Sequence, residues 1–310
     1  MGNLPLPRIS QVKPFLHSGV DYGGPFTIFM SRYRGAKECK SYICLFVCMS
    51  TKAMHLELAS DLSSDAFLAC LRRFVSRRGR CAHLYSDQGT NFVGSSNEIK
   101  NMLRDTASAE TIEHHFLPGN APHMGGLWKS GIKAVKTHLK RVIGEQVLTY
   151  EEFYTVLTQI EAVLNSRPLT PLSSDVNDLS VLTPGHFLTL EPLSAIPDQE
   201  LTNVPIPRLK RWQLIQRLHQ DFWRRWKVEY LHTLQQRSKW LTSSPPPAIG
   251  TLVLIKSDNA PPLQWEMGRI MKVHPGLDNV VRVATVKTRR GTLKRPLLKL
   301  CPLPIDDVKA

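Results

Sequence analysis

Two aspartates are the residues of this sequence whose types and settings suggest chemistry. Asp21 lies in a strand-like run that glycines interrupt, GVDYGGPF, and Asp87 follows a short apolar run in LYSDQGTNF. Each carboxylate is therefore expected at the end of a strand. Two carboxylates on neighbouring strand ends can share a divalent cation, because hard ions such as Mg2+ prefer oxygen ligands. The alternative is that each aspartate caps a turn, a frequent role for Asp beside Gly.

A third element, residues 118–140, favours a shared site over two separate turns. A loop rich in proline and glycine is followed by a predicted helix that buries Leu127, Val135, Leu139 and Val142. The opposite helix face carries a row of lysines spaced i, i+4, i+7 and i+11: Lys129, Lys133, Lys136 and Lys140. An aligned lysine row suits a phosphate backbone, although a solvated helix face has the same pattern.

The basic charge is concentrated in the C-terminal third. The net charge of the chain is +14. Residues 208–299 contain 19 basic and 5 acidic side chains, a difference of +14, so the rest of the chain is neutral overall. A field of one sign on one segment favours a polyanionic partner, most commonly nucleic acid. The alternative is a solvated basic surface.

Composition excludes several classes. The chain of 310 residues is 42% hydrophobic and 21% charged, which is ordinary for a globular protein of two or three domains. Its longest apolar run, residues 42–49, is far shorter than the roughly 18 residues of a membrane helix. The first residues, MGNLPLPR, lack the apolar core of a secretory signal. We expect a soluble intracellular protein without a membrane partner.

Cysteine and histidine spacing predicts no zinc site. The six cysteines form no CxxC pair, and those at positions 44, 48, 70 and 81 are expected to pack as small hydrophobes. His114 and His115 are adjacent, so they should point to opposite faces of a strand and not bind one metal.

Periodicity predicts a mixed α/β architecture for the first half. An antiparallel meander of three strands is followed by alternating helices and strands. The expected strands are residues 15–29, 40–50, 53–59, 81–86 and 112–117, and the expected helices are 63–78, 95–107 and 149–165. Strand 53–59 alternates in polarity, which indicates a half-exposed strand. Helix 149–165 begins with a capping-box pattern at Thr149 and Glu152.

The second half changes character twice. Residues 168–207 are rich in proline and serine and predict a surface connector, and residues 208–240 predict a helix with a tryptophan-rich stripe suited to packing. After a linker at 243–247, four short strands in about 55 residues suggest a small barrel. The strands are expected at 251–255, 268–274, 280–288 and 292–296. Their apolar residues alternate with cations: Arg269, Lys272, Arg282, Lys287, Arg289, Arg290, Lys294 and Arg295.

These residues resemble one family along nearly the whole chain, from Gly2 to Pro304. GVDYGGPF, SDQGTNF and NAPHMGGLW are similar to the integrase core of BEL/Pao-type LTR retrotransposons. The continuation NSRPLTPLSSD, LTPGHFL, RWQLIQRLHQDFWRRW, LQQRSKW and the tail from PPLQWEMGR onward also resemble that family. The resemblance implies four parts: a linker remnant, a ribonuclease H-like catalytic core, a connector with amphipathic helices, and an SH3-like DNA-binding barrel. Their expected bounds are 1–14, 15–167, 168–247 and 248–304.

The resemblance implies DNA integration, the metal-dependent transfer of DNA 3′ ends into target DNA. In the family two Asp and one Glu hold two Mg2+ or Mn2+ ions for an in-line displacement at phosphorus. Asp21 and Asp87 match the two aspartates. DNA, bound through phosphate contacts, and further copies of the chain are the implied partners, and the nucleus is the implied location.

The third carboxylate does not match. The residue after Gly-Gly-Leu-Trp, Glu in the family, is Lys129 here, and its helix has no acid before Glu145. We expect Lys129 to pair with Asp21 and Asp87 in the space of a metal ion, so that metal binding and catalysis are weakened. The family also carries a His2Cys2 zinc domain before the core, which this sequence does not supply, as expected of a truncated copy.

Three hypotheses follow. The chain is an impaired integrase, a catalytically inert nucleic-acid-binding remnant, or a protein-interaction scaffold that uses the helix at 208–240. The nucleic-acid-binding remnant predicts a steep loss of DNA affinity as salt rises, whereas the scaffold predicts binding that is insensitive to salt. A ribonuclease H enzyme is a weaker option, because the extra acid Glu57 is predicted on a strand and not on a helix.

Overall fold

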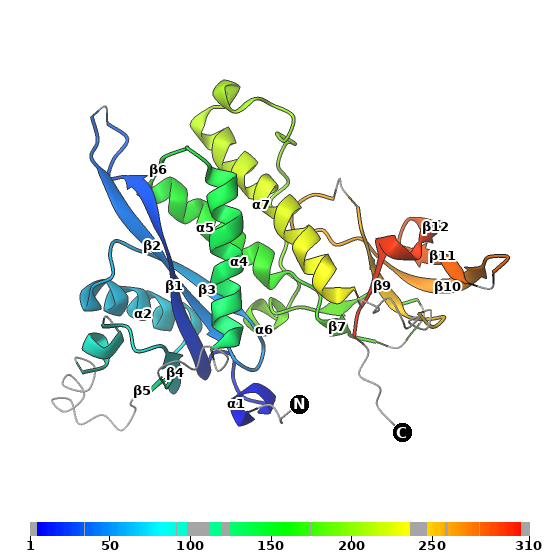
Figure 1. Ribbon diagram of the computed structural model, residues 1–310, viewed down its shortest axis with the longest axis horizontal. Coiled ribbons are helices and arrows are strands. Elements are labelled where there is room, and N and C mark those ends of the chain that lie inside the picture. The colour runs from blue at the N-terminus through cyan, green and yellow to red at the C-terminus, as the bar shows by residue number, and fades with distance from the viewer. Residues whose placement is uncertain are drawn as a thin grey trace.

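The computed structural model describes residues 5–33, 35–90, 92–97, 112–118, 125–173, 175, 177–235, 247–257, 260–278 and 280–304. The first half of the chain folds around a mixed β-sheet (Figure 1). β1 (His17–Phe29), β2 (Glu38–Cys48) and β3 (Met54–Ala59) form the predicted antiparallel meander, and β4 (His83–Ser86) and β5 (Glu113–Phe116) add in parallel. The order β3-β2-β1-β4-β5 is that of a ribonuclease H-like sheet.

Helices cover both faces of this sheet. α2 (Ser64–Arg78) packs through Phe67 and Phe74 on one face, and α4 (Gly126–Ile143) and α5 (Tyr150–Asn165) lie on the other. β2 is an almost continuous apolar run because both of its faces are buried. The short strand β6 (Leu148–Thr149) pairs with the end of β1 and leads into α5.

The ends of these helices follow the sequence signals. The Ser63 hydroxyl oxygen accepts a hydrogen bond from the Ala66 backbone N–H at 3.2 Å, and Gly79 with φ of 81° ends α2. The predicted capping box at Thr149 and Glu152 is present at the start of α5. Cys44, Cys48, Cys70 and Cys81 are buried, as predicted.

The predicted half-exposure of β3 is wrong. His55 is 1% exposed and Glu57 is fully buried, because α2 covers their face of the sheet. α5 covers the outer edge of the strand: the Asn165 side chain accepts from Met54 N–H at 2.8 Å and donates to Met54 O at 2.7 Å. Glu161 accepts from Leu56 N–H at 2.8 Å. The edge is thus hydrogen-bonded although no further strand of the described chain pairs with it.

Two other predictions need qualification. The segment expected as an N-terminal linker contains a short helix, α1 (Leu6–Ile9). The helix expected at 95–107 is described only as far as residue 97, and much of the loop before α4 and of the linker at 243–247 lies outside the described residues.

The connector runs over the surface with a small hairpin, β7 (Thr170–Pro171) and β8 (Val181–Leu182), then α6 (His186–Thr189) and a 3-10 turn, η1 (Ile206–Arg208). It leads into α7 (Arg211–Leu234), the longest described helix, which packs against α4 and α5 (Figure 1). Trp223, which lies outside the predicted stripe, and Trp226 are buried beside Trp265. The predicted packing role of the stripe is confirmed at Ile215, Leu218, Phe222 and Trp226, which are all buried. Trp212 is the exception, at 59% exposed.

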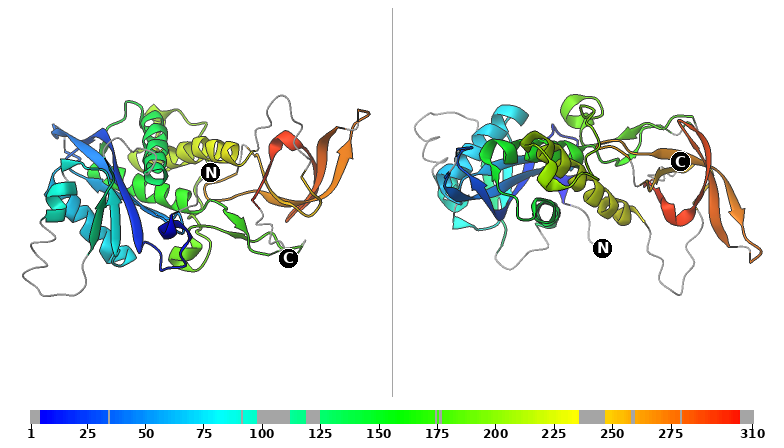
Figure 2. Two further views of the ribbon diagram at one scale, coloured as in Figure 1. Left: turned by 60° about the horizontal axis from the view of Figure 1, so that its bottom comes forward. Right: turned by 90° about the horizontal axis from the view of Figure 1, so that it is seen from above.

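The C-terminal part is a five-stranded antiparallel sheet that curls into a small SH3-like barrel, at the end of the long axis remote from β5 (Figure 2). Its strands are β9 (Leu252–Ile255), β10 (Met267–Pro275), β11 (Val281–Thr288), β12 (Gly291–Pro296) and β13 (Leu300–Pro302), with a 3-10 turn, η2 (Leu297–Lys299), before the last. The first four confirm the prediction. β13 is new: three residues are too few for alternation to show, but pairing with β9 buries Leu300 and Cys301.

Candidate active site and nucleic-acid surface

Strand register brings Asp21 and Asp87 together. β1 and β4 are parallel, with Gly19 opposite Tyr85. Both aspartates lie two residues further along, and because side chains alternate with a period of two, they are expected on the same face of neighbouring strands. Asp87 follows the last residue of β4, Ser86, as the sequence predicted.

Two glycines bring α4 directly onto this face. A Cβ atom on Gly19 would lie 2.1 Å from the Trp128 ring, and one on Gly23 would lie 2.9 Å from the Ile132 side chain. Larger residues at either position would push the helix away from β1. Asp21 lies between these two contacts, so its carboxylate faces the first turns of the helix that carries the lysine row.

The electrostatics of Asp21 show how closely these groups lie. Burial raises its pKa to about 6, and the negative charge of Asp87 adds to the rise. A hydrogen bond from the Tyr22 backbone N–H at 2.8 Å and the charges of Lys129 and Lys136 oppose it. Asp87 accepts a hydrogen bond from Gly89 N–H at 3.0 Å. Two adjacent, partly desolvated carboxylates form a site that favours a cation.

Lys129 does not fill that site. Its charge lowers the pKa of Asp21, but it forms no salt bridge with either aspartate among the described residues. The predicted direct ion pair is therefore wrong. The reason is the direction of the side chain, which runs back along the helix: its Cε lies 3.2 Å from where a Cβ of Gly125 would be.

The donor set fits one divalent ion and not two. Asp21 and Asp87 offer the oxygen ligands that Mg2+ or Mn2+ prefers, and water would complete the shell. Glu57 adds no ligand, because the register Tyr22–Cys44–Glu57 places it on the opposite face from Asp21. It instead accepts hydrogen bonds from Arg73 at 2.6 Å and Arg77 at 2.9 Å, in a buried ion network between β3 and α2.

The other lysines of α4 keep to the side predicted. Lys133 and Lys140 are exposed, and Lys136 is half-buried near Asp21. The Lys140 ammonium lies 5.9 Å from the centre of the Phe26 ring, which orients it along the sheet. A positively charged row thus leads away from the carboxylates.

The barrel presents some of the predicted cations on one face. Thr285 of β11 lies opposite Lys272 of β10 on one side and opposite Lys294 of β12 on the other, so the two lysines share one face of the sheet. Lys287 lies two residues after Thr285 on the same strand, so it belongs to that face as well. Arg289 and Arg290 are exposed at the turn between β11 and β12. We call Lys272, Lys287 and Lys294 the barrel lysine face.

Arg269 must be removed from the predicted nucleic-acid contacts. Its side chain is 4% exposed and donates to three backbone carbonyls, Asp178 at 3.0 Å, Gly250 at 2.9 Å and Ser173 at 2.6 Å. It fixes the connector hairpin to the barrel. Arg282 is exposed but binds Asp278 through two hydrogen bonds of 2.9 and 2.6 Å, and Arg295 is half-buried on the other side of β12.

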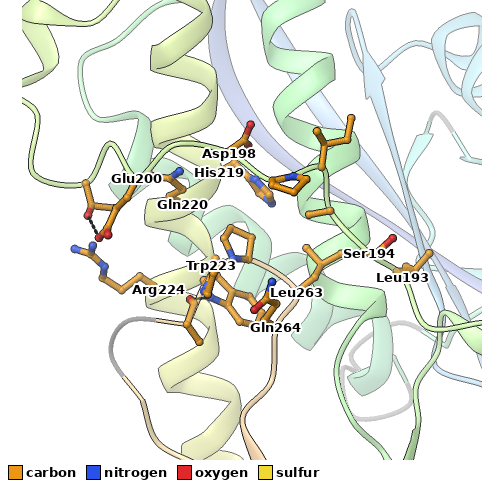
Figure 3. A pocket seen from close by; sticks show the side chains of 17 residues that line it. Leu193, Ser194, Asp198, Glu200, His219, Gln220, Trp223, Arg224, Leu263 and Gln264 are labelled. Atoms are coloured by element: carbon orange, nitrogen blue, oxygen red, sulfur yellow. Dashed lines mark hydrogen bonds between the residues drawn. The ribbon is translucent and has the colours of Figure 1, made fainter. Parts of the chain in front are cut away.

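A pocket of about 260 Å³ lies beside α7, and sequence analysis did not predict it (Figure 3). Its lining comes from residues 193–202, from α7 and from residues 260–264. His219 is buried there, and burial lowers its pKa to about 4, although Asp198 opposes this. Among the described residues neither ring nitrogen has a hydrogen-bond partner. No motif signals this pocket, because three separate segments form it.

A cluster of three polar side chains was also missed. His83, Glu113 and His115 project from β4 and β5, with one donor atom from each lying within 4.8 Å of the others. As predicted, His114 points away from His115: it hydrogen-bonds the Ser86 hydroxyl at 2.8 Å. The cluster could not be predicted because it depends on the register of β4 and β5, in which His83 lies opposite Glu113 and Tyr85 lies opposite His115.

Comparisons with known proteins give matches of several kinds. Residues 210–303 match a family of unknown function (DUF5641). No curated protein matches the chain. Among the described residues, no helix has the length and apolarity needed to cross a membrane.

Several solved structures are similar. A chain from the intasome of simian T-cell lymphotropic virus, in complex with the PP2A regulatory subunit B56 gamma, is 13% identical with a TM-score of 0.42, over 99% of this chain and 85% of that one. The HTLV-2 integrase catalytic core domain in complex with magnesium is similar in two forms. The trimeric form is 15% identical with a TM-score of 0.37, over 57% of this chain and 98% of that one. The dimeric form is 14% identical with a TM-score of 0.36, over 50% of this chain and 90% of that one. We assign the fold from strand order and register.

Proposed function

We propose that this chain is an integrase-type protein of a BEL/Pao-like retrotransposon, one that binds DNA but joins DNA ends weakly. The observation that carries the proposal is the placement of Asp21 and Asp87 side by side, with Lys129 near them where the family has its third carboxylate. A divalent ion held by the two aspartates would polarise a reacting oxygen at phosphorus. The cationic side chain at position 129 disfavours a second ion.

The lysines are assigned to the DNA backbone. Lys133, Lys136 and Lys140 form a positive row beside the carboxylates, and the barrel lysine face offers a second positive surface. Long flexible ammonium groups on flat sheet and helix faces suit phosphates better than base edges. We therefore expect affinity with little sequence preference, which competition with scrambled duplexes would check.

The test is DNA binding as a function of salt. Lys272→Ala/Lys294→Ala should flatten the plot of log affinity against log salt by about 2, because each lost phosphate contact removes about 0.9 from the slope. Lys37→Ala/Lys40→Ala removes the same charge from exposed positions at the β1–β2 hairpin and serves as the control. Fluorescence anisotropy of a labelled duplex gives both slopes. Equal slopes for the two variants would remove the barrel lysine face from the proposal.

Two alternatives are retained. A catalytically inert remnant would show the same DNA binding but no DNA joining of its own, whereas an impaired integrase would retain weak joining that Asp87→Asn abolishes. A protein-interaction scaffold would bind its partner independently of salt, and it would have to use exposed positions of α7 such as Trp212, since Trp223 and Trp226 are buried internally. Assembly into homo-oligomers and a nuclear location belong to the integrase proposal.

A further inference from the structure

The three donor atoms of His83, Glu113 and His115 form a compact triangle. His83 Nδ1 lies 3.0 Å from His115 Nε2 and 3.2 Å from Glu113 Oε2, and His115 Nε2 lies 3.7 Å from the same oxygen. Zinc is bound by imidazole nitrogen and carboxylate oxygen at about 2.0 to 2.2 Å in tetrahedral geometry. The edges of such a tetrahedron are about 3.3 to 3.6 Å long, close to the three separations.

Neighbouring rings brace the two histidines. His17 stacks on His83 with ring centres 4.4 Å apart and planes 4° from parallel, and Tyr85 stacks on His115 at 4.7 Å and 16°. His17 Nδ1 and the Tyr85 hydroxyl are 3.2 Å apart, which links the two stacks. The imidazoles thus have fixed orientations before any ion binds, as metal ligands require.

We propose that His83, Glu113 and His115 form a zinc site that ties the edge strand β5 to β4. β5 has only four residues, none of them fully buried, so a cross-strand metal link would supply stability that its packing does not. Water would occupy the fourth position. Two imidazoles favour zinc or a similar transition metal over Mg2+ or Ca2+.

This site is separate from the aspartate pair. His83 begins β4, and Asp87 follows its end, four residues or roughly 13 Å along the strand at about 3.3 Å per residue. Its ligands also differ in kind, since the aspartate pair has oxygen donors alone. The two sites can therefore be titrated independently.

The experiment measures zinc binding by the full chain after chelation and dialysis, using isothermal titration with zinc and absorption of the cobalt form. We expect one zinc per chain, and a cobalt spectrum of tetrahedral nitrogen and oxygen ligands without thiolate charge-transfer bands. His83→Ala/His115→Ala should weaken zinc binding at least about 100-fold. Zinc should raise the melting temperature of the wild-type chain and not of this variant.

Three further variants make the result decisive. His114→Ala, one residue away on the opposite face, should bind zinc like the wild type, and so should Asp21→Asn/Asp87→Asn. Glu113→Gln changes an exposed side chain and should weaken binding even if the double histidine variant folds poorly. The proposal would be overturned if the histidine and Glu113 variants kept the wild-type zinc affinity, if the aspartate variant lost it, or if the wild-type chain bound no zinc in the titration.

Discussion

At the scale of residues, Asp21 is where function and stability are in conflict. Its carboxylate is partly buried beside a second carboxylate, and both effects disfavour its charged form and raise its pKa. Carboxylates kept in such a setting reduce the stability of the fold at neutral pH. We argue that this is the signature of a ligand position and not of a turn cap, because a capping aspartate keeps a low pKa.

Asp21→Asn should therefore stabilise the protein at neutral pH. The folded-state pKa is raised from 3.8 to about 6, so the folded state holds the proton more tightly and the penalty develops as pH rises through this window. At 1.36 kcal/mol per pKa unit, the variant should gain at most about 3 kcal/mol above pH 7 and nothing near pH 3.5. Urea unfolding at the two pH values measures this.

Magnesium supplies the control for that prediction. An ion on the aspartate pair should raise the free energy of unfolding of the wild-type chain at pH 7.5 and leave Asp21→Asn unchanged. A variant no more stable than the wild type at pH 7.5 would show that the pKa of Asp21 is ordinary.

At the scale of elements, β3 shows how a helix replaces a missing strand. Asn165 and Glu161 of α5 hydrogen-bond the free edge of β3, so α5 is both a cover for the sheet and a partner of its edge. This double role explains why two polar residues of α5 are buried: Glu161 is 8% exposed and Asn165 is 1% exposed.

Asn165→Ala should destabilise the core by about 1 to 3 kcal/mol, because it leaves the N–H and C=O of Met54 without their partners in a partly buried position. Thr158→Ala, on the exposed side of the same helix, is the matched control and should change stability by less than about 0.5 kcal/mol. Urea denaturation followed by tryptophan fluorescence compares the two. Similar effects of both substitutions would mean that the edge contacts contribute little.

Most elements could be predicted from the sequence, and the reasons for the misses are physical. Apolar runs and caps such as Ser63 and Thr149 act locally, so β1, β2, α2 and α5 are readable. The burial of Glu57 depends on arginines from another element, and β13 depends on pairing with β9, so neither has a local signal.

The residues of the candidate site likewise fall into those that the sequence predicted and those that it did not. Asp21, Asp87 and the lysine row were readable because turn formers and helical spacing mark them. Arg269 was misassigned, because alternation in a strand cannot distinguish a cation that faces solvent from one that donates to backbone carbonyls. The His83 cluster required the register of two strands that are far apart in sequence.

At the scale of the whole molecule, α7 joins the ribonuclease H-like core to the barrel. Trp223 donates to Ala260 O at 2.8 Å and Lys227 to Ser257 O at 2.6 Å, while Trp265 donates to the Ser166 hydroxyl at 3.2 Å. These partly buried hydrogen bonds, two of them to backbone carbonyls and one to a hydroxyl, tie α7 and the end of α5 to the segments that lead into the barrel. The barrel lysine face and the carboxylate pair are thus held by one packed structure, as the proposed contact of both surfaces with DNA requires.

The most direct test of the account is DNA joining by the Lys129→Glu variant. A manganese-dependent disintegration assay on a branched DNA substrate would compare the wild-type chain, Lys129→Glu and Lys133→Glu, the last changing the same charge one turn along the helix. We predict an inactive or very weak wild-type chain, clear activity for Lys129→Glu that Asp87→Asn abolishes, and no gain for Lys133→Glu. A wild-type chain as active as Lys129→Glu, or a Lys129→Glu chain that binds DNA yet remains inactive, would contradict the assignment of position 129 as the lost third ligand.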